Sequence, residues 1–211
     1  MSRPLVTGDV ARVAAVLREG GLAVYPTETF YGLGARATDA RALTRLVEAK
    51  LRPEGKPLPL VAADRAMAFA AWADAGEEAR LLADRFWPGP LTLVATAAPG
   101  LPAEVAGGGT VGVRVPGSPV ARELSRLAGG LLVSTSANPS GGPPPVRVED
   151  LDPALLAHVD AVLDGGRTPG GLPSTVVELG PGGTRLLRAG AVPWGEVEQA
   201  LHRGRLPSRQ A

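Results

Sequence analysis

The sequence contains no cysteine and only two histidines, His158 and His202, among its 211 residues. The absence of cysteine excludes disulfides, thiol catalysis and cysteine-ligated metals, and it is compatible with a reducing cytoplasm. Both histidines fall on predicted helices that are remote in sequence from the glycine-rich loops, so neither a histidine-based triad nor a zinc site is expected. Any chemistry must therefore come from other side chains.

Long apolar runs and a surplus of charge are missing as well. Nowhere do 18 apolar residues follow one another without a charge or a proline, and the N-terminus lacks the apolar core of a signal peptide. The formal net charge is +1 at pH 7, which is too small for a protein that coats nucleic acid through its overall charge. We expect a soluble, cytoplasmic protein without membrane contact, in which any anion site is local.

The common phosphate-binding motifs are also absent. No G-x-x-x-x-G-K-[ST] string occurs, which excludes a P-loop. The segment GGGTVG, residues 107–112, matches the dinucleotide pattern G-x-G-x-x-G, but it precedes a predicted strand, whereas the dinucleotide fingerprint follows one. We therefore interpret these glycines as a loop and not as a Rossmann site.

Lysine is scarce in a chain that uses arginine for most of its positive charge. Only two of the 22 basic residues are lysines, Lys50 and Lys56, and the other 20 are arginines. A lysine in such a chain suggests a position where a compact ammonium group is needed and a guanidinium does not serve. Lys50 also closes a predicted helix, where the helix dipole favours either cation. The sequence leaves both interpretations of Lys50 open.

Helical and strand patterns alternate along the whole chain. Apolar residues recur at helical spacing in some segments and in short runs in others, and Asp9 and Asp39 stand where helix caps are expected. The expected helices cover residues 9–21, 39–50, 77–86 and 194–204, with others beginning near residues 118 and 150. The expected strands cover residues 22–25, 57–61, 91–95, 111–115, 131–138, 161–165, 174–179 and 185–190. This order predicts one α/β domain, residues 1–211, built on a single mixed sheet.

Basic and hydroxyl-bearing residues gather at the ends of these strands. The first strand runs into PTETFYGLG, residues 26–34, which we expect to form a glycine-rich loop at the mouth of the strand. Open α/β sheets bind their ligands at such strand ends. Fixed cations together with hydroxyl donors suit a triphosphate and a carboxylate. The sequence thus predicts a local anion site formed by loops that are far apart in the chain.

Taken in order, these strings resemble the threonylcarbamoyl-AMP synthase family of YrdC-like proteins, over about residues 20–190. The strings are YPTETFYGLG at 25–34, Lys50 and Arg52 in a K-x-R pattern, FWPGPLTL at 86–93, VGVRVP at 111–116 and STSANPSG at 134–141. The resemblance implies a twisted mixed β-sheet flanked by helices, with a concave basic cavity, in the short single-domain form of the family. It also implies a nucleotidyltransferase, L-threonylcarbamoyladenylate synthase. That enzyme makes threonylcarbamoyl-AMP and pyrophosphate from L-threonine, bicarbonate and ATP, the first step of the t6A37 modification of tRNA.

Carried over residue by residue, the resemblance implies two groups of binding residues. The L-threonine site comprises Thr27, Arg114, Ser134 and Ser174, and the ATP site comprises Lys50, Arg52, Thr110, Ser136, Asn138 and Arg188. No acid or base is implied: Lys50 and Arg52 act by electrostatic positioning, and Mg²⁺ is held mainly by the ATP phosphates and not by protein ligands. The resemblance also implies downstream threonylcarbamoyl-transfer proteins as partners, and it leaves direct contact with tRNA open.

Two other functions stay open from the residues alone. A binding module could hold structured RNA such as tRNA in a basic concavity without catalysis, and its binding would weaken steeply with salt. The near-neutral net charge and the many hydroxyl groups argue against this module. A related carbamoyl-adenylate-forming enzyme would use carbamoyl phosphate in place of threonine and bicarbonate.

Overall fold

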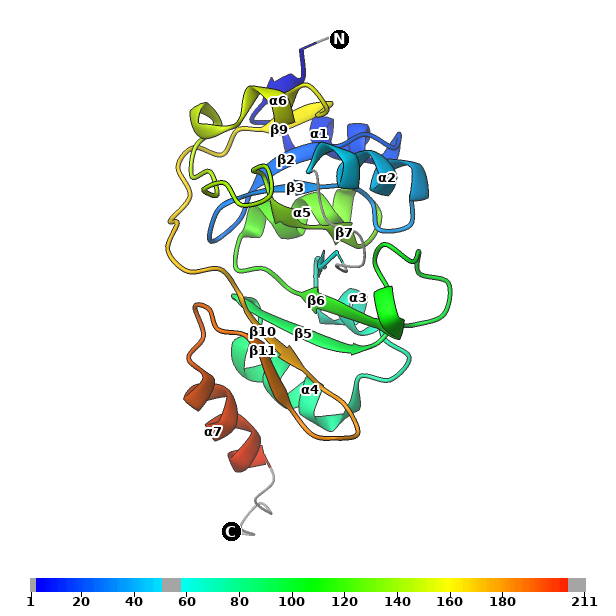
Figure 1. Ribbon diagram of the computed structural model, residues 1–211, viewed down its shortest axis with the longest axis vertical. Coiled ribbons are helices and arrows are strands. Elements are labelled where there is room, and N and C mark those ends of the chain that lie inside the picture. Colours follow the sequence, from blue (N-terminus) through cyan, green and yellow to red (C-terminus); the bar gives the residue numbers. More distant parts are fainter. Residues whose placement is uncertain (1–2, 51–57, 205–211) are drawn as a thin grey trace.

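The computed structural model describes residues 3–50 and 58–204 and consists of helices packed against two separate mixed β-sheets (Figure 1). The expected α/β class is confirmed, but the expectation of a single mixed sheet is wrong. In Figure 1 the five-stranded sheet lies in the upper half with the N-terminus, and the six-stranded sheet lies in the lower half with the C-terminal helix. The site must therefore be sought between two sheets and not at the edge of one.

The five-stranded sheet combines parallel and antiparallel pairs. Its strands, in spatial order, are β1 (Leu5–Thr7), β9 (Ala161–Leu163), β2 (Ala23–Pro26), β3 (Tyr31–Gly34) and β8 (Thr135–Ser136). β1, β9 and β2 run parallel, whereas β3 pairs antiparallel with both β2 and β8. Three strands from the first 34 residues therefore share one sheet with two strands from beyond residue 134.

The six-stranded sheet is mixed in a similar way. Its strands, in spatial order, are β11 (Arg185–Arg188), β10 (Thr175–Glu178), β5 (Leu91–Thr96), β6 (Thr110–Arg114), β4 (Leu60–Val61) and β7 (Leu132–Val133). β10 runs parallel to β5 and β4 runs parallel to β6, while the other three pairs are antiparallel. The strand ends that carry Arg114 and Arg188 thus belong to the same sheet.

Seven α-helices are described. They are α1 (Val10–Arg18), α2 (Ala40–Ala49), α3 (Arg65–Phe69), α4 (Gly76–Phe86), α5 (Pro119–Leu127), α6 (Pro153–Leu156) and α7 (Trp194–Gly204), with short 3-10 turns at Gly107–Gly109 and Val148–Asp150. In Figure 1, α1, α2, α5 and α6 lie with the five-stranded sheet, and α3, α4 and α7 lie with the six-stranded sheet. α1 packs on α5 and α4 packs on α7.

The helix boundaries follow from local signals in the sequence. Asp9 accepts from the backbone N–H groups of the first turn of α1, and Asp39 does the same for α2, so both expected caps are confirmed. Gly20 ends the first helical segment with a φ of 82°, which favours glycine. Val13 and Leu17 of α1 are fully buried, as their spacing predicts.

The glycine-rich segment after β2 is a β-hairpin and not a loop. β3 pairs with β2 along its whole length, from Tyr31 opposite Pro26 to Gly34 opposite Ala23. Tyr31 and Leu33 are fully buried. The expectation of a loop over residues 26–34 is therefore wrong beyond Phe30. Glycine is uncommon in strands, so the sequence pattern did not indicate one here. In this strand the glycines leave room for neighbouring atoms that approach the backbone closely.

Gly34 is the clearest case of such an approach. A Cβ atom at this position would lie 2.4 Å from the carbonyl oxygen of Val133 and 2.7 Å from Cε1 of Tyr25. We expect Gly34→Ala to lower the free energy of unfolding by about 1–3 kcal/mol, because backbone and a buried ring must move. Urea denaturation measures the loss, and Gly130→Ala is the control, since a Cβ there would meet no atom within 4 Å. Equal stability of the two variants would contradict the close contact.

One short run of the chain contributes to both sheets. β7 forms an edge of the six-stranded sheet, and β8, which begins two residues later, forms an edge of the five-stranded sheet. Ser134 lies between them and donates its backbone N–H to the carbonyl oxygen of Pro59 (2.9 Å). The segment expected as one strand over residues 131–138 therefore changes sheets at Ser134, which explains why two sheets form where one was expected.

Candidate functional site

A cavity of about 900 Å³ is lined by residues of both sheets. Every predicted site residue that the structure describes lines it: Thr27, Lys50, Thr110, Arg114, Ser134, Ser136, Asn138, Ser174 and Arg188. Arg52, predicted beside Lys50, lies outside the described residues. The structure thus brings the predicted residues to one place, while their individual roles stay predictions.

Thr27 closes the turn of the β2–β3 hairpin. Its hydroxyl donates to the carbonyl oxygen of Phe30 (2.7 Å) and accepts from the backbone N–H groups of Thr29 (3.2 Å) and Phe30 (3.3 Å). The residue is buried. Because the hydroxyl proton is used within the turn, Thr27 shapes the wall of the cavity and holds the hairpin turn in place.

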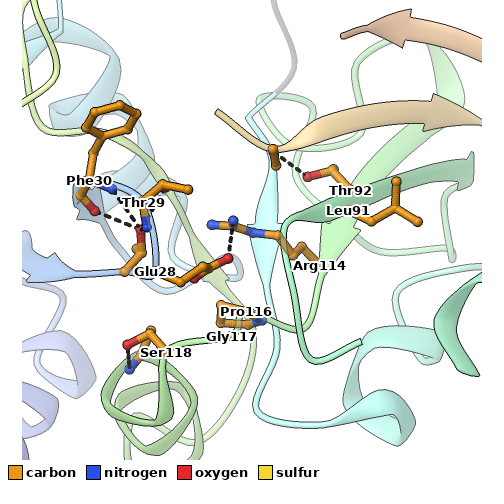
Figure 2. A network of polar contacts seen from close by, with 12 residues as sticks. Glu28, Thr29, Phe30, Leu91, Thr92, Arg114, Pro116, Gly117 and Ser118 are labelled. Atoms are coloured by element: carbon orange, nitrogen blue, oxygen red, sulfur yellow. Dashed lines mark hydrogen bonds and ion pairs between the residues drawn. The ribbon is translucent and has the colours of Figure 1, made fainter. Parts of the chain in front are cut away.

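Arg114, the last residue of β6, points from the six-stranded sheet toward this hairpin turn (Figure 2). Its Nη1 donates to Oε1 of Glu28 at 2.5 Å, and the two side chains are only 10% and 17% exposed. Glu28 lies in the turn between β2 and β3. The ion pair therefore connects the two sheets at the wall of the cavity.

Ser174, which directly precedes β10, is held by hydrogen bonds from two other strands. Its hydroxyl lies 2.9 Å from Oγ1 of Thr92 in β5 and accepts from Nη2 of Arg188 at 3.0 Å. Arg188 also donates to the carbonyl oxygen of Ser174 through Nε (3.1 Å) and Nη2 (2.7 Å). These contacts fix the hydroxyl of Ser174 on the wall formed by the six-stranded sheet.

Lys50 follows the last turn of α2 and ties one segment of the cavity wall in place. Its Nζ donates to the carbonyl oxygens of Ser136 (2.5 Å) and Asn138 (2.6 Å). Its own carbonyl oxygen accepts from the backbone N–H (3.3 Å) and the hydroxyl (2.9 Å) of Ser140. Lys50 is only 3% exposed. Two carbonyl oxygens that converge on one nitrogen suit a compact ammonium group, so this contact gives a structural reason for lysine at this position.

Asn138 leaves one polar atom without a partner in the described part of the chain. Its Nδ2 donates to the carbonyl oxygens of Pro139 (3.0 Å) and Gly142 (2.6 Å). Its Oδ1 is buried, and no described residue donates to it. A buried acceptor that lacks a donor costs free energy, so this atom is suited to accept a hydrogen bond from a ligand in the cavity.

Positive charge is concentrated on the cavity wall. Desolvation of the Arg188 side chain, followed by the nearby charge of Arg114, lowers the pKa of the Arg188 guanidinium. An arginine nevertheless stays charged at neutral pH. Arg114 pairs with Glu28, whereas no carboxylate among the described residues forms an ion pair with Arg188, so a bound anion would stabilise the Arg188 guanidinium.

Sequence reasoning missed Glu28 and Thr92. Both stand inside strings that carried the family resemblance, so a carboxylate and a strand hydroxyl beside predicted cations were the available signals. Their partners were not visible, because Glu28 and Arg114 are 86 residues apart and Thr92 and Ser174 are 82 residues apart.

The described residues also limit what the site can hold. Within residues 3–50 and 58–204, no group of three or more His, Cys, Asp or Glu side chains could bind a metal ion. His158 lies just beyond α6 and His202 lies on α7, and both are exposed. In the same part of the chain, no helix is long and apolar enough to cross a membrane.

Comparison with known proteins shows similarity along most of the chain. A family profile named Sua5_yciO_yrdC, described as "Telomere recombination", matches residues 15–190. The threonylcarbamoyl-AMP synthase of Pyrococcus abyssi is 40% identical over 192 residues, which cover 90% of this chain and 56% of that protein. The threonylcarbamoyl-AMP synthase of Bacillus subtilis is 38% identical over 201 residues, which cover 93% of this chain and 58% of that protein.

The same similarity holds for the fold. The crystal structure of P. abyssi Sua5 complexed with L-threonine matches with a TM-score of 0.86 at 36% identity, covering 95% of this chain and 61% of that one. The chain thus spans less than two thirds of the length of these relatives. Since the family profile matches most of the sequence and the folds agree, the chain belongs to the Sua5/YciO/YrdC family.

Proposed function

We propose that this chain is an L-threonylcarbamoyladenylate synthase, which begins the t6A37 modification of tRNA. The observation that carries the proposal is a cavity of about 900 Å³ in which cations and hydroxyl groups from both sheets meet. This volume lies within the roughly 300–1,000 Å³ typical of ligand pockets. Relatives with the name threonylcarbamoyl-AMP synthase, and a similar structure described as complexed with L-threonine, support the same function.

In this proposal, L-threonine binds beside Arg114. A guanidinium has five N–H donors, and the contact with Glu28 uses one of them, which leaves donors for the threonine carboxylate. Ser134 and Ser174 offer hydroxyl groups nearby on the cavity wall. Thr27 contributes through the hairpin turn that it closes.

ATP takes the part of the cavity formed by the segment around Ser136 and by Arg188. Lys50 fixes the backbone of this segment, and the unpartnered Oδ1 of Asn138 can accept a hydrogen bond from the nucleotide. Thr110 and the predicted Arg52 belong to the same proposed site. Mg²⁺ would arrive with the ATP phosphates, because phosphate oxygens and water are the ligands it prefers in such sites.

The proposed reaction gathers negative charge and does not depend on a protein base. The threonine amine attacks carbon dioxide derived from bicarbonate and forms an anionic carbamate, and the proton that the amine loses balances the proton taken up when bicarbonate loses water. A carbamate oxygen then attacks the α-phosphorus of ATP, the bond from that phosphorus to the bridging oxygen breaks, and pyrophosphate leaves. Fixed cations lower the energy of such charge development by positioning and electrostatic stabilisation. A threonylcarbamoyl-transfer protein would then use the adenylate.

Pyrophosphate release tests this proposal directly. We expect release only when L-threonine, bicarbonate, ATP and Mg²⁺ are all present, because the carbamate must form before the α-phosphorus is attacked. The measurement is the rate of pyrophosphate formation by the purified protein with each component omitted in turn. Release that does not depend on threonine would contradict the proposal. Release that instead requires carbamoyl phosphate would indicate the related carbamoyl-adenylate reaction.

A further inference from the structure

Glu28 and Arg114 form a partly buried ion pair across the two sheets (Figure 2). Glu28 comes from the hairpin turn of the five-stranded sheet, and Arg114 ends β6 of the six-stranded sheet. The Nη1–Oε1 distance of 2.5 Å and side-chain exposures of 10% and 17% mark a contact that water does not screen strongly. The pair therefore constrains where the guanidinium group lies.

Hydrogen bonds hold the backbone on the Glu28 side. The neighbouring residues Thr29 and Phe30 both donate their backbone N–H groups to the hydroxyl of Thr27. The carbonyl oxygen of Thr29 accepts from the backbone N–H of Gly170 at 2.7 Å. The turn thus presents the Glu28 carboxylate from a fixed position.

The segment that follows Arg114 is shaped to receive this carboxylate. A Cβ atom on Gly117 would lie 3.3 Å from Cγ of Glu28, so the glycine allows the side chain to pack against the backbone. Arg122 of α5 holds the same segment by donating to the carbonyl oxygens of Pro116 (2.7 Å) and Gly117 (3.0 Å). The side chain of Glu28 therefore packs against backbone that Arg122 holds, while its Oε2 is buried and accepts from no described residue.

We propose that Glu28 is a positioning residue that orients the Arg114 guanidinium toward the carboxylate of the amino-acid substrate. This inference rests on the proposed function and deepens it. An arginine side chain has many rotamers, and a fork-shaped contact with a carboxylate requires one orientation. Glu28 engages a single Nη atom, so it selects the orientation of the guanidinium while leaving its other donors for the substrate.

A purely structural ion pair predicts a different behaviour. If the pair only joined the sheets, loss of Glu28 would lower the fraction of folded protein and reduce turnover at every substrate concentration. If Glu28 orients Arg114, its loss raises the KM for threonine selectively, because the guanidinium must be ordered by the substrate itself. The KM for ATP is the internal comparison.

The test compares Glu28→Ala and Glu28→Gln with the wild type and with Glu123→Ala, a surface control whose ion pair with Arg126 is exposed. We expect Glu28→Ala to raise the KM for threonine by about tenfold, with little change in the KM for ATP or in kcat. Glu28→Gln retains an acceptor of the same shape and should recover part of the loss. In the Arg114→Ala background, Glu28→Ala should add less than about a twofold further effect, since the group that it orients is gone.

The outcomes separate the inference from the function on which it rests. Normal wild-type turnover together with an unchanged KM for threonine in Glu28→Ala or Glu28→Gln would overturn the positioning role alone. Equal increases in the KM for threonine and the KM for ATP would also overturn it, because they indicate a structural role. Wild-type protein that releases no threonine-dependent pyrophosphate would overturn the proposed function and the inference with it. Glu28→Gln keeps the test valid if Glu28→Ala does not fold.

Discussion

Arg114→Ala is expected to raise the threonine concentration needed for half-maximal pyrophosphate release by roughly 30- to 1,000-fold. A charge-assisted contact between a guanidinium and a carboxylate in a partly buried site contributes about 2–4 kcal/mol, which corresponds to that range. The ATP requirement should change much less, because the nucleotide is proposed to lie beside Arg188. Steady-state kinetics with each substrate varied in turn measure both effects.

Loss of Arg114 also leaves the carboxylate of Glu28 without its partner, so stability must be measured beside activity. Arg114→Lys keeps the positive charge but lacks the planar fork, and it should restore folding more fully than threonine binding. Arg126→Ala removes a largely exposed arginine that pairs with Glu123 and should change neither property. A folded Arg114→Ala protein with normal threonine dependence would assign the substrate carboxylate to another cation.

Lys50→Met is expected to lower the free energy of unfolding by about 2–4 kcal/mol. The substitution keeps an unbranched side chain one atom shorter than lysine but removes the donor to the carbonyl oxygens of Ser136 and Asn138, and each acceptor left without a partner costs about 1–3 kcal/mol. Urea denaturation measures the change. Activity should fall as well, because these carbonyls belong to the segment proposed to bind ATP.

Two further variants show whether the stability depends on the positive charge of Lys50 or on how its side chain fits the buried site. Lys50→Arg keeps the charge but inserts a larger group into a nearly fully buried site, and it should still cost about 1–3 kcal/mol. In Arg18→Met, an exposed cation at the end of α1 loses its bond to the carbonyl oxygen of Leu127. This control should cost less than about 1 kcal/mol. Wild-type stability of Lys50→Met would show that Lys50 does not support the segment.

Features of the fold that depend on near neighbours were predictable from the sequence. Asp9 and Asp39 cap their helices as expected, because a capping side chain reaches only the next two or three residues. The strand at Tyr31–Gly34 was not predicted, because Gly34 is required by the close approach of Val133 and Tyr25, and no local pattern records such neighbours. The division into two sheets was hidden for a similar reason, since strands as short as β7 and β8 carry almost no periodicity.

In the candidate site, likewise, the positions of the residues could be predicted from the sequence, but their contacts with residues far along the chain could not. The family resemblance located nine cavity-lining residues, six within the quoted strings and three (Thr110, Ser174 and Arg188) outside them, because the resemblance assigns positions without needing contacts. The partners of these residues were not predictable. The bond from Lys50 to the Asn138 carbonyl and the pair between Glu28 and Arg114 join residues 88 and 86 positions apart, so only the folded chain shows them.

Each sheet combines strands that are far apart in the sequence, and this has a consequence for how the chain folds as it is synthesised. β1 pairs only with β9, and β3 has no second neighbour until β8 has emerged, so the five-stranded sheet stays incomplete until about residue 163. The six-stranded sheet waits for β11, which ends at Arg188. Such high contact order makes folding slow and leaves apolar faces of α1 and α2 exposed on the nascent chain. The ligand cavity and the hydrophobic core are thus completed together, late in synthesis.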